Sequence, residues 1–319
     1  MGDSQPMNCP ICSGPTERVI ELPDFCGVDQ AFLFCESCSH GKLEVFEPQP
    51  LNTVMGEGGY LQAFAEFVRP YWKPNVLDIG GNDGALGDLV LPETYAVVES
   101  IETADLREWK DKPKLILSSH TLEHIRYPGQ FFSQVDSILG PNDFLAIQVP
   151  SLELLVDDAR IDQIHNQHYH YFSERSLTTL LKRYGMRAIE VKFNPDHWGA
   201  VMLICQQGKG EVSGRQLYRT DVSFARFAFT SQMDLTRYTL ARGPFACYGA
   251  SPMLPVLSYY LPIEDALFIA DDFKSPYKAE DLKGRDVLIT AVSKMTARKL
   301  VKKAFEVGAR NVIVPFHQL

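Results

Sequence analysis

The stretch Val76-Leu77-Asp78-Ile79-Gly80-Gly81-Asn82-Asp83-Gly84 decides the fold. It begins with apolar residues typical of a buried strand, and it ends in a glycine-rich turn that lets a ligand approach the backbone closely. The ligand of an open parallel sheet binds beyond the carboxyl ends of the strands. The stretch therefore predicts a cofactor site at the edge of an α/β sheet, and a purely structural turn is the alternative.

The sequence around this turn alternates strand and helix patterns from about residue 55 to residue 210. A helix opened by Ser173 and closed near Gly185 fits between two of the strands. Alternation of this kind indicates a mostly parallel, doubly wound sheet. The expected strands are Asn75 to Ile79, Tyr95 to Val98, Leu115 to Ser118, Phe144 to Val149, Ala188 to Phe193 and Val201 to Cys205.

Two acidic residues indicate which cofactor this turn binds. Asp78 precedes the first glycine, where a carboxylate suits a cationic amino-acid group better than a pyrophosphate. Glu99 ends the second strand about 20 residues on, where an acid can hold both hydroxyls of a ribose. Because G-G-x-x-G also departs from the dinucleotide pattern, we expect S-adenosylmethionine and not NAD. The predicted cofactor-binding residues are Asp78, Gly80, Gly81, Asn82, Gly84, Glu99, Ser119 and His120.

The third strand ends in Ser118-Ser119-His120-Thr121-Leu122-Glu123-His124-Ile125. At this edge of the sheet the side chains face the place where cofactor and substrate meet, so His124 is a candidate catalytic residue. His120 and His124 could share a metal ion if the segment were helical, but it lacks the HExxH order. Capping or packing is the alternative role for His120.

A second constellation is Asp162-Gln163-Ile164-His165-Asn166-Gln167-His168-Tyr169-His170-Tyr171-Phe172-Ser173, which holds three of the eight histidines. On a strand these histidines would alternate between faces, so they cannot all point into one site. General acid-base catalysis, a second metal site and a structural role remain open here. Tyr171 to Ser173 would lead into the next helix.

Two cysteine pairs, Cys9-Pro-Ile-Cys12 and Cys35-Glu-Ser-Cys38, lie upstream of the glycine turn. Two CxxC turns place four thiolates around one tetrahedral ion with no open position, which predicts structural zinc bound by Cys9, Cys12, Cys35 and Cys38. A redox dithiol or a disulfide pair is the alternative. The 22 residues between the pairs contain a further cysteine, Cys26, and Glu47-Pro48-Gln49-Pro50 resembles a linker after the second pair.

The C-terminal third predicts a second, smaller α/β unit. A helical stretch near Gly214 to Thr239 leads into Phe245-Ala246-Cys247-Tyr248-Gly249-Ala250-Ser251, a strand that runs into a glycine turn. Gly249 to Ser251 could hold a phosphate or simply join strand to helix. An NAD site at this turn, with Asp271 or Asp272 on the ribose, is an alternative with an incomplete glycine pattern. The later strands would be Ala266 to Ala270, Asp286 to Val292 and Asn311 to Val314.

The composition bounds the class of protein. The 319 residues are 45% hydrophobic and 22% charged, with a formal charge of −9, so a nucleic-acid partner is not expected. The basic run around Lys294, Arg298 and Lys303 has helical spacing and is interpreted as a solvated helix face. The odd number of cysteines, with neither a signal peptide nor a membrane-spanning run, predicts a cytoplasmic protein that does not bind membranes.

The order of these segments resembles the three-part sugar C-methyltransferases. The resemblance rests on the cysteine module, the D-I-G-G-N-D-G turn, the T-L-x-H-I segment, the D-Q-I-x-x-x-H…F-S segment and the C-terminal Y-G-A-S-P unit. It implies methylation of a carbon next to the ketone of a nucleotide-linked deoxysugar. It further implies that His124 is an active-site histidine and that His168 removes the proton from the sugar carbon.

This chain departs from the resembled family at three places. The family has tyrosine, any residue and glutamate before the base, whereas this chain has His165, Asn166 and Gln167. Gln167 cannot act as a carboxylate, but it can orient a ring by hydrogen bonding. Where the family has a histidine and two glycines, this chain has His197-Trp198-Gly199-Ala200. Donors such as His165 or Tyr171 would stabilise the enolate, so the predicted catalytic residues are His168, His124, His165, Gln167 and Tyr171.

We therefore expect three parts: a zinc-binding module over residues 1–54, a class I, Rossmann-like methyltransferase domain over 55–210, and a helical connection with a smaller Rossmann-like domain over 211–319. The expected substrate is a small molecule, a nucleotide-linked sugar, bound by a monomer or small homo-oligomer. Methyl transfer to oxygen or nitrogen, an NAD-linked oxidoreductase, and a binding protein without turnover are the alternative functions.

Overall fold

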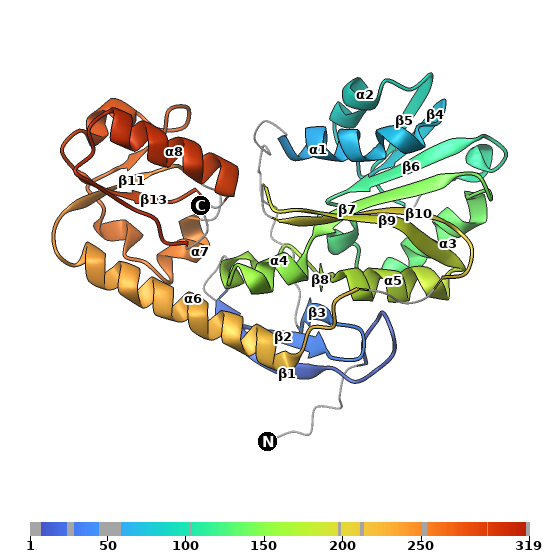
Figure 1. Ribbon diagram of the computed structural model, residues 1–319, viewed down its shortest axis with the longest axis horizontal. Coiled ribbons are helices and arrows are strands. Elements are labelled where there is room, and N and C mark those ends of the chain that lie inside the picture. Colours follow the sequence, from blue (N-terminus) through green and yellow to red (C-terminus); the bar gives the residue numbers. More distant parts are fainter. Residues whose placement is uncertain are drawn as a thin grey trace.

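The computed structural model describes residues 8–23, 29–44, 59–101, 104–196, 199–210, 214–250, 254–291 and 293–316. Cys26, the linker Glu47-Pro48-Gln49-Pro50, the pair His197 and Trp198, and Ser251 lie outside these ranges, as does the predicted boundary at residues 54 and 55. The described residues form three sheets, each in a different part of the molecule (Figure 1).

The central sheet has six strands in the order β5-β4-β6-β7-β10-β9. Neighbours among the first four strands run parallel, whereas β10 is antiparallel to both β7 and β9. The predicted strands are confirmed, with ends that differ by at most two residues. They are β4 (Asn75–Ile79), β5 (Thr94–Val98), β6 (Lys114–Ser119), β7 (Phe144–Pro150), β9 (Met186–Asn194) and β10 (Ala200–Gln207).

Helices cover both faces of this sheet because side chains alternate along each strand. Leu77, Ile79 and Ile116 face one core with helices α3 and α5, and Val76 and Leu115 face the other core with α1 and α2. The sheet is therefore doubly wound, as predicted. The helices and short 3-10 turns are α1 (Gly59–Val68), η1 (Arg69–Tyr71), α2 (Ala85–Val90), η2 (Arg107–Trp109), η3 (Leu122–His124), α3 (Pro128–Ile138), α4 (Leu152–Asp157), η4 (Ile161–Gln163) and α5 (Glu174–Arg183).

Helix α5 begins where the sequence predicts. The Ser173 Oγ accepts a hydrogen bond from the Ser176 N–H at 3.0 Å, and the Ser176 Oγ accepts one from the Ser173 N–H at 2.8 Å. This reciprocal cap satisfies two backbone donors at the helix start. Gly185 follows the helix with φ +66°, a left-handed conformation that favours glycine.

The N-terminal sheet contains one strand that the sequence assigned to the central domain. Its order is β1 (Glu17–Pro23), β2 (Asp29–Cys35), β3 (His40–Leu43) and β8 (His170–Tyr171), and it is antiparallel throughout. Strand β8 pairs with β3 through Gly41↔Tyr171 and Lys42↔His170. The part of the chain that follows the predicted catalytic histidines is thus built into the cysteine-containing sheet, so the division at residue 54 does not separate two independent sheets.

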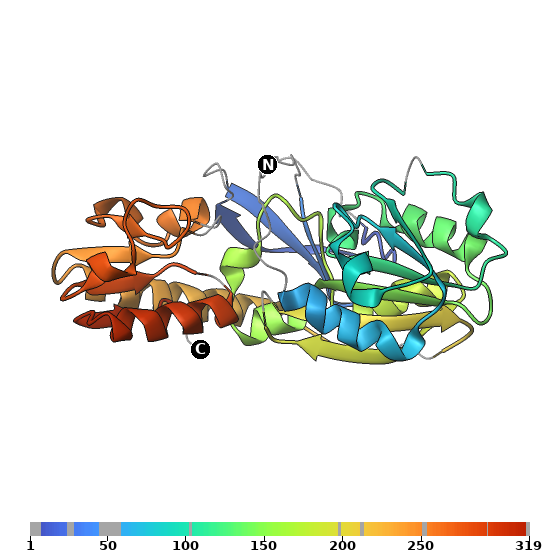
Figure 2. The same cartoon turned by 90° about the horizontal axis from the view of Figure 1, so that it is seen from above.

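The C-terminal unit is a parallel sheet in the order β12-β11-β13-β14, joined to the rest by the long helix α6. Helix α6 begins at Arg219, later than predicted, because Tyr218 is its extended N-cap. Figure 2 shows this unit and the central domain at opposite ends of the elongated molecule. The elements are α6 (Arg219–Leu240), β11 (Phe245–Tyr248), α7 (Leu254–Ser258), η5 (Ile263–Asp265), β12 (Ile269–Ala270), η6 (Ala279–Leu282), β13 (Asp286–Ile289), α8 (Lys294–Glu306) and β14 (Asn311–Ile313).

One apolar cluster joins the three parts. Phe32 and Phe34 of β2, Leu155 of α4, Phe229 of α6 and Leu288 of β13 belong to the same buried core. None of the helices in the described part of the chain is long and apolar enough to cross a membrane.

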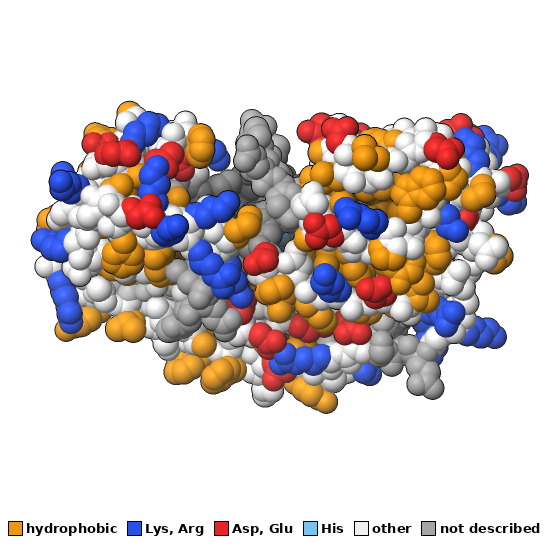
Figure 3. Space-filling view, turned by 45° about the horizontal axis from the view of Figure 1, so that its top comes forward, with side chains coloured by type: hydrophobic (Ala, Val, Ile, Leu, Met, Phe, Trp, Pro, Cys, Tyr) orange, Lys and Arg blue, Asp and Glu red, His pale blue; other side chains and the backbone are white. Residues whose placement is uncertain are grey.

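The basic run on α8 is largely paired with acids. Lys294 forms an ion pair with Asp158 at the end of α4, and Lys303 Nζ lies 3.1 Å from Asp272 Oδ2. On the face shown in Figure 3, Lys and Arg side chains are interspersed with Asp and Glu over the same unit. This arrangement fits the interpretation of α8 as a solvated and ion-paired helix, since acidic side chains lie among the basic ones on that face.

Candidate functional site

The glycine turn after β4 has the backbone geometry that only glycine tolerates well. Gly80 has φ +76°, and a Cβ on it would lie 2.2 Å from the Thr121 Oγ1. A Cβ on Gly81 would lie 2.6 Å from the carboxyl group of Asp78. Packing within the protein therefore already requires glycine at positions 80 and 81, in addition to any space that a bound ligand needs. Asn82, also predicted at the cofactor, is exposed in a left-handed conformation with φ +49°.

Asp78 lies beneath this turn, completely buried. Its Oδ2 accepts a hydrogen bond from the hydroxyl of Tyr95 in β5, and its Oδ1 has no hydrogen-bond partner among the described residues. Burial raises the pKa of Asp78 to about 6, because desolvation disfavours the charged carboxylate. The sequence indicates Tyr95 only as the start of a strand and gives no sign of this contact with Asp78.

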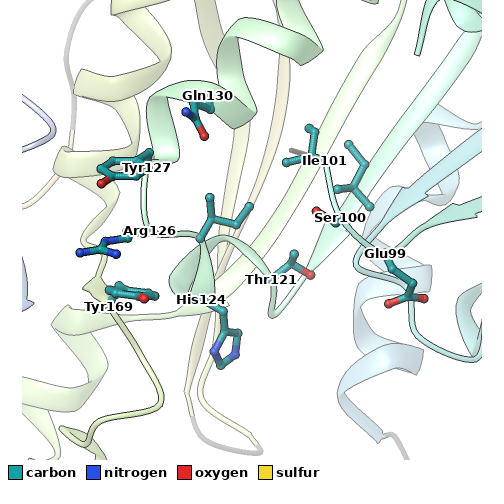
Figure 4. A pocket seen from close by; sticks show the side chains of 11 residues that line it. Glu99, Ser100, Ile101, Thr121, His124, Arg126, Tyr127, Gln130 and Tyr169 are labelled. Atoms are coloured by element: carbon teal, nitrogen blue, oxygen red, sulfur yellow. The ribbon is translucent and has the colours of Figure 1, made fainter. Parts of the chain in front are cut away.

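A cavity of about 600 Å³ opens beyond the carboxyl ends of β4, β5 and β6 (Figure 4). Glu99 lies on one side of it and Tyr127 and Tyr169 on the other, with Thr121 and His124 between them. Glu99 and His124 were predicted for the cofactor and the chemistry respectively, and both line this one cavity. It lies where the ligand of a parallel sheet is expected.

His120 packs behind this cavity. It has φ +51°, its Nδ1 lies 3.2 Å from Glu123 Oε1, and its Nε2 accepts from Gln148 Nε2 at 2.9 Å. These contacts favour the packing role over cofactor binding for His120. Ser119, at the end of β6, has a buried hydroxyl with no partner among the described residues.

His124 is the histidine that faces the cavity, with 47% of its side chain exposed. Its Nδ1 lies 2.7 Å from the backbone oxygen of Gln167. Because a carbonyl oxygen only accepts, Nδ1 carries the proton and the lone pair of neutral His124 is on Nε2. That Nε2 lies 4.0 Å from Oε1 of Glu123. Gln167 therefore orients His124 through its backbone, whereas the sequence suggested that its side chain orients His168.

Glu123 is an acidic residue of this site that the sequence does not mark as functional. It is only 1% exposed and belongs to η3, directly before His124. The sequence shows Glu123 directly before His124, but this position does not indicate that the Glu123 side chain is buried beside the histidine. The backbone oxygen of Glu123 accepts from the Tyr169 N–H at 2.9 Å and links η3 to the histidine loop, residues 164–169.

The histidine loop brings His165 and His168 together and separates His170 from them. The rings of His165 and His168 have centroids 4.7 Å apart, and those of His124 and His168 lie 4.9 Å apart. His170 instead bonds to His40, with 3.1 Å between its Nδ1 and the His40 Nε2. The prediction that the three histidines cannot share one site is thus confirmed, although residues 164–169 form a loop and not a strand.

Tyr171 positions this loop. Its hydroxyl accepts from the His165 N–H and donates to the His165 backbone oxygen, both at 2.8 Å. The hydroxyl is thereby directed at the loop, which does not support its predicted role as a donor to an enolate. The structure gives Tyr171 a positioning role.

Burial keeps the loop histidines neutral. It lowers the pKa of His165 to about 3 and holds the pKa of His168 well below its usual range, where the nearby rings of His165, His124 and His120 add to the effect. Neutral imidazoles keep a lone pair for a proton or a metal ion.

The four predicted zinc ligands converge. Their sulfur atoms lie within 4.8 Å of one another, with 3.6 Å between Cys9 and Cys38 and 3.5 Å between Cys12 and Cys35. Four sulfurs each about 2.3 Å from one ion would lie about 3.8 Å apart, so the geometry suits a tetrahedral ion. Hydrogen bonds from the thiols of Cys38 and Cys9 lower the pKa of Cys35.

Each cysteine pair is followed by a residue in the left-handed conformation, Ser13 with φ +63° and Ser39 with φ +58°. Tight turns of this kind let both sulfurs of a pair face one point. The Gly14 N–H also donates to the Cys12 sulfur at 3.4 Å. These features, together with distances too long for a disulfide, favour a metal site over a disulfide pair.

The C-terminal glycine turn is occupied by the protein's own side chains. Asp271 Oδ2 accepts from the Ala250 N–H at 2.8 Å, and its Oδ1 accepts from the N–H groups of Phe273 and Lys274. Asp272 bonds to the Tyr248 hydroxyl at 2.9 Å and to Lys303. Neither carboxylate is left for a ribose in this structure, which disfavours the NAD alternative and also the phosphate role of Gly249 and Ala250.

Residues 41–191 match the family model of the methyltransferase domain. This range contains the glycine turn, Glu99, His124 and the histidine loop, and the chain therefore contains a methyltransferase domain of the S-adenosylmethionine-dependent kind. The cysteine pairs and the C-terminal unit lie outside the match.

One curated relative is the C-methyltransferase NovU of Streptomyces niveus, 28% identical over 90 residues, which is 28% of this chain. The match spans about a fifth of that relative, 21% of its length. A similar solved structure is the 1,6-didemethyltoxoflavin-N1-methyltransferase of Burkholderia thailandensis with bound S-adenosylhomocysteine, with 14% identity, TM-score 0.41, and coverage of 53% of this chain and 96% of that one. Another is an S-adenosylmethionine-dependent methyltransferase from Clostridium acetobutylicum, with 9% identity, TM-score 0.37, and coverage of 50% and 95%.

Proposed function

We propose that the protein transfers the methyl group of S-adenosylmethionine to a carbon next to the ketone of a nucleotide-linked deoxysugar. The observation that carries this proposal is the shared cavity, where Glu99 on the cofactor side and His124 on the reaction side line one space beyond the sheet. The similarity to a C-methyltransferase supports the choice of carbon as acceptor.

The chemistry needs a base and a place for the enolate. His124 Nε2 has its lone pair free for a proton, since Nδ1 donates to Gln167. When that nitrogen takes the proton of the sugar carbon, the imidazolium forms 4.0 Å from the carboxylate of Glu123, which stabilises it. His168, the base implied by the family resemblance, packs against His124 and is only 6% exposed. We therefore assign the proton transfer to His124, and we give His168 a supporting role through its ring contact with His124.

The cysteine module is proposed to bind one structural zinc ion through Cys9, Cys12, Cys35 and Cys38. A site with four sulfur ligands has no open position for chemistry. Its effect on catalysis is mechanical: β3 of the module pairs with β8, and β8 follows the histidine loop.

The test is incubation of the purified protein with S-adenosylmethionine and a panel of 4-keto nucleotide sugars in heavy water, read by mass spectrometry. Methylation with deuterium at the carbon beside the ketone is the expected result. Methylation without exchange would instead identify an oxygen or nitrogen acceptor, which is the second candidate function. Binding of S-adenosylhomocysteine with no methylation of any sugar would contradict the proposed substrate class.

A further inference from the structure

We infer that Glu123, His124 and His168 form a second metal site, at the wall of the cavity, which takes a divalent ion such as Zn²⁺. One ligand atom from each of these three side chains lies within 4.8 Å of the others. They come from η3 and from the histidine loop, which are far apart in the sequence. The sequence alone suggests a metal site at His120 and His124, or one within the histidine-rich segment 162–173. This site instead combines residues from both segments.

Glu123 supplies the negative charge. Its Oε2 is buried and has no hydrogen-bond partner among the described residues, and its only described ion-pair partners are His120 and His124. Histidines are cationic only when protonated, so a buried carboxylate here lacks a permanent countercharge. A divalent ion bound by this carboxylate would supply that charge. Oε1, which accepts from His120 Nδ1, is the oxygen that lies 4.0 Å from His124 Nε2.

His124 has the hydrogen bond that metal-binding histidines usually have. Its Nδ1–H donates to a backbone carbonyl, that of Gln167, which fixes the ring and leaves Nε2 to face Glu123. Glu123 is oriented in the same way, because His120 bonds to it and Gln148 bonds to His120. The groups that usually orient metal ligands are thus present around both His124 and Glu123.

His168 contributes the third ligand. Its Nδ1 is buried without a hydrogen-bond partner among the described residues, and its ring lies edge-on to that of His124. An unpartnered buried nitrogen costs free energy unless something binds it. Two histidines and one glutamate are a ligand set found in catalytic zinc sites, which keep a further position open for water or substrate.

The chemical role of the ion rests on the proposed function, whereas its binding does not. With the ion bound, Nε2 of His124 is a ligand and no longer the base, and a bound water takes over that role. The water would lose a proton to solvent at a lowered pKa, and the resulting hydroxide would take the proton of the sugar carbon and become water. The electron pair of the broken C–H bond would spread onto the keto oxygen, which the ion polarises. The carbanion would then bond to the methyl carbon as the C–S bond of S-adenosylmethionine breaks, with that electron pair left on sulfur. The ion would take over the role of the glutamate carboxylate that the resembled family has at the position of Gln167.

Cobalt binding to the full-length protein with its cysteine site already loaded with zinc tests the inference. We expect one further Co²⁺ per chain by elemental analysis, with visible d–d bands but without the intense charge-transfer band of cobalt thiolates. The Glu123→Gln and His168→Ala variants should each weaken cobalt binding about 100-fold or more. Loss of a contact that only orients a metal ligand already lowers metal affinity about 10- to 100-fold, and these variants lose a ligand itself.

Gln130→Ala is the matched control, because Gln130 lines the same cavity and is not among the three ligands. It should bind cobalt as the wild type does. If a buried variant does not fold, His124→Asn replaces it, since that side chain is half-exposed. The inference is overturned if the chain binds no cobalt in addition to its one zinc ion, or if the cobalt affinity is unchanged in all three ligand variants. Deuterium exchange and methylation by protein that binds no second ion would sustain the proposed function without the metal.

Discussion

His40 and His170 form a buried hydrogen bond that joins the cysteine module to the methyltransferase domain, with 3.1 Å between Nε2 of the first and Nδ1 of the second. His40 lies two residues after Cys38, and His170 lies two residues after His168. Together with the pairing of β3 and β8, this bond makes the position of the histidine loop depend on the cysteine turns.

We therefore expect Cys38→Ser to lower the free energy of unfolding by about 3 kcal/mol or more, because metal binding in such modules is coupled to folding. Hydrogen-deuterium exchange should rise at residues 164–171 while the central strands remain protected. Ser37→Ala, in the same turn and exposed, is the control. Unchanged exchange in the loop of the Cys38→Ser variant would show that β8 does not depend on the proposed zinc site.

His124 and His168 should both be needed for turnover. His168→Ala should lower turnover and leave the affinity for S-adenosylhomocysteine within a few-fold, because its buried ring packs against His124 and is not among the residues that line the cavity with Glu99. His124→Gln should reduce turnover by about 10²- to 10⁴-fold, the usual contribution of a general base. Rates and calorimetric affinities measured on the same preparations check this, with Tyr127→Phe as a control at the cavity wall. Unchanged turnover in His168→Ala would remove that residue from the mechanism.

The sequence predicted the sheet well and the catalytic contacts less well, for a physical reason. Buried strands such as Asn75 to Ile79 are set by local hydrophobic patterns, which are visible in one segment. The contact of Glu123 with His124, the bond from Tyr95 to Asp78 and the pairing of β8 with β3 depend on which distant segments meet. The hydroxyl of Tyr171 shows the same limit: its residue type suits catalysis, but the fold of the loop directs it to the backbone of His165.

Glu99 should determine much of the cofactor affinity. Glu99→Ala should weaken binding of S-adenosylhomocysteine about tenfold or more, because hydrogen bonds to a charged acceptor contribute about 1.5–3 kcal/mol. Isothermal titration calorimetry measures this directly, and Glu99→Asp should recover part of the loss. The exposed Glu108→Gln controls for the change in net charge. An affinity unaffected by Glu99→Ala would place the ribose elsewhere in the cavity.

Glu153, the first-turn acid of α4, should make stability depend on pH. Burial raises its pKa to about 7, although its oxygens accept bonds from Ser151 Oγ at 2.9 Å and from the Glu174 N–H at 2.7 Å. Below about pH 4.5 the group is protonated in the folded and unfolded chain alike, and its contribution to stability is fully present. As the pH rises toward 7 the unfolded chain ionises first, so that contribution is lost.

Glu153→Gln cannot ionise, and it should therefore gain stability relative to the wild type by about 2 kcal/mol between pH 5 and pH 8. The amide has one acceptor oxygen fewer than the carboxylate, and this shifts the stability of the variant by the same amount at every pH. The quantity to measure is therefore the change, between the two pH values, in the stability of the variant relative to the wild type. Urea denaturation at both pH values gives it, with Glu108→Gln again as the exposed control. A difference between wild type and Glu153→Gln that stays constant across this range would mean that Glu153 ionises at the same pH in the folded and unfolded chain.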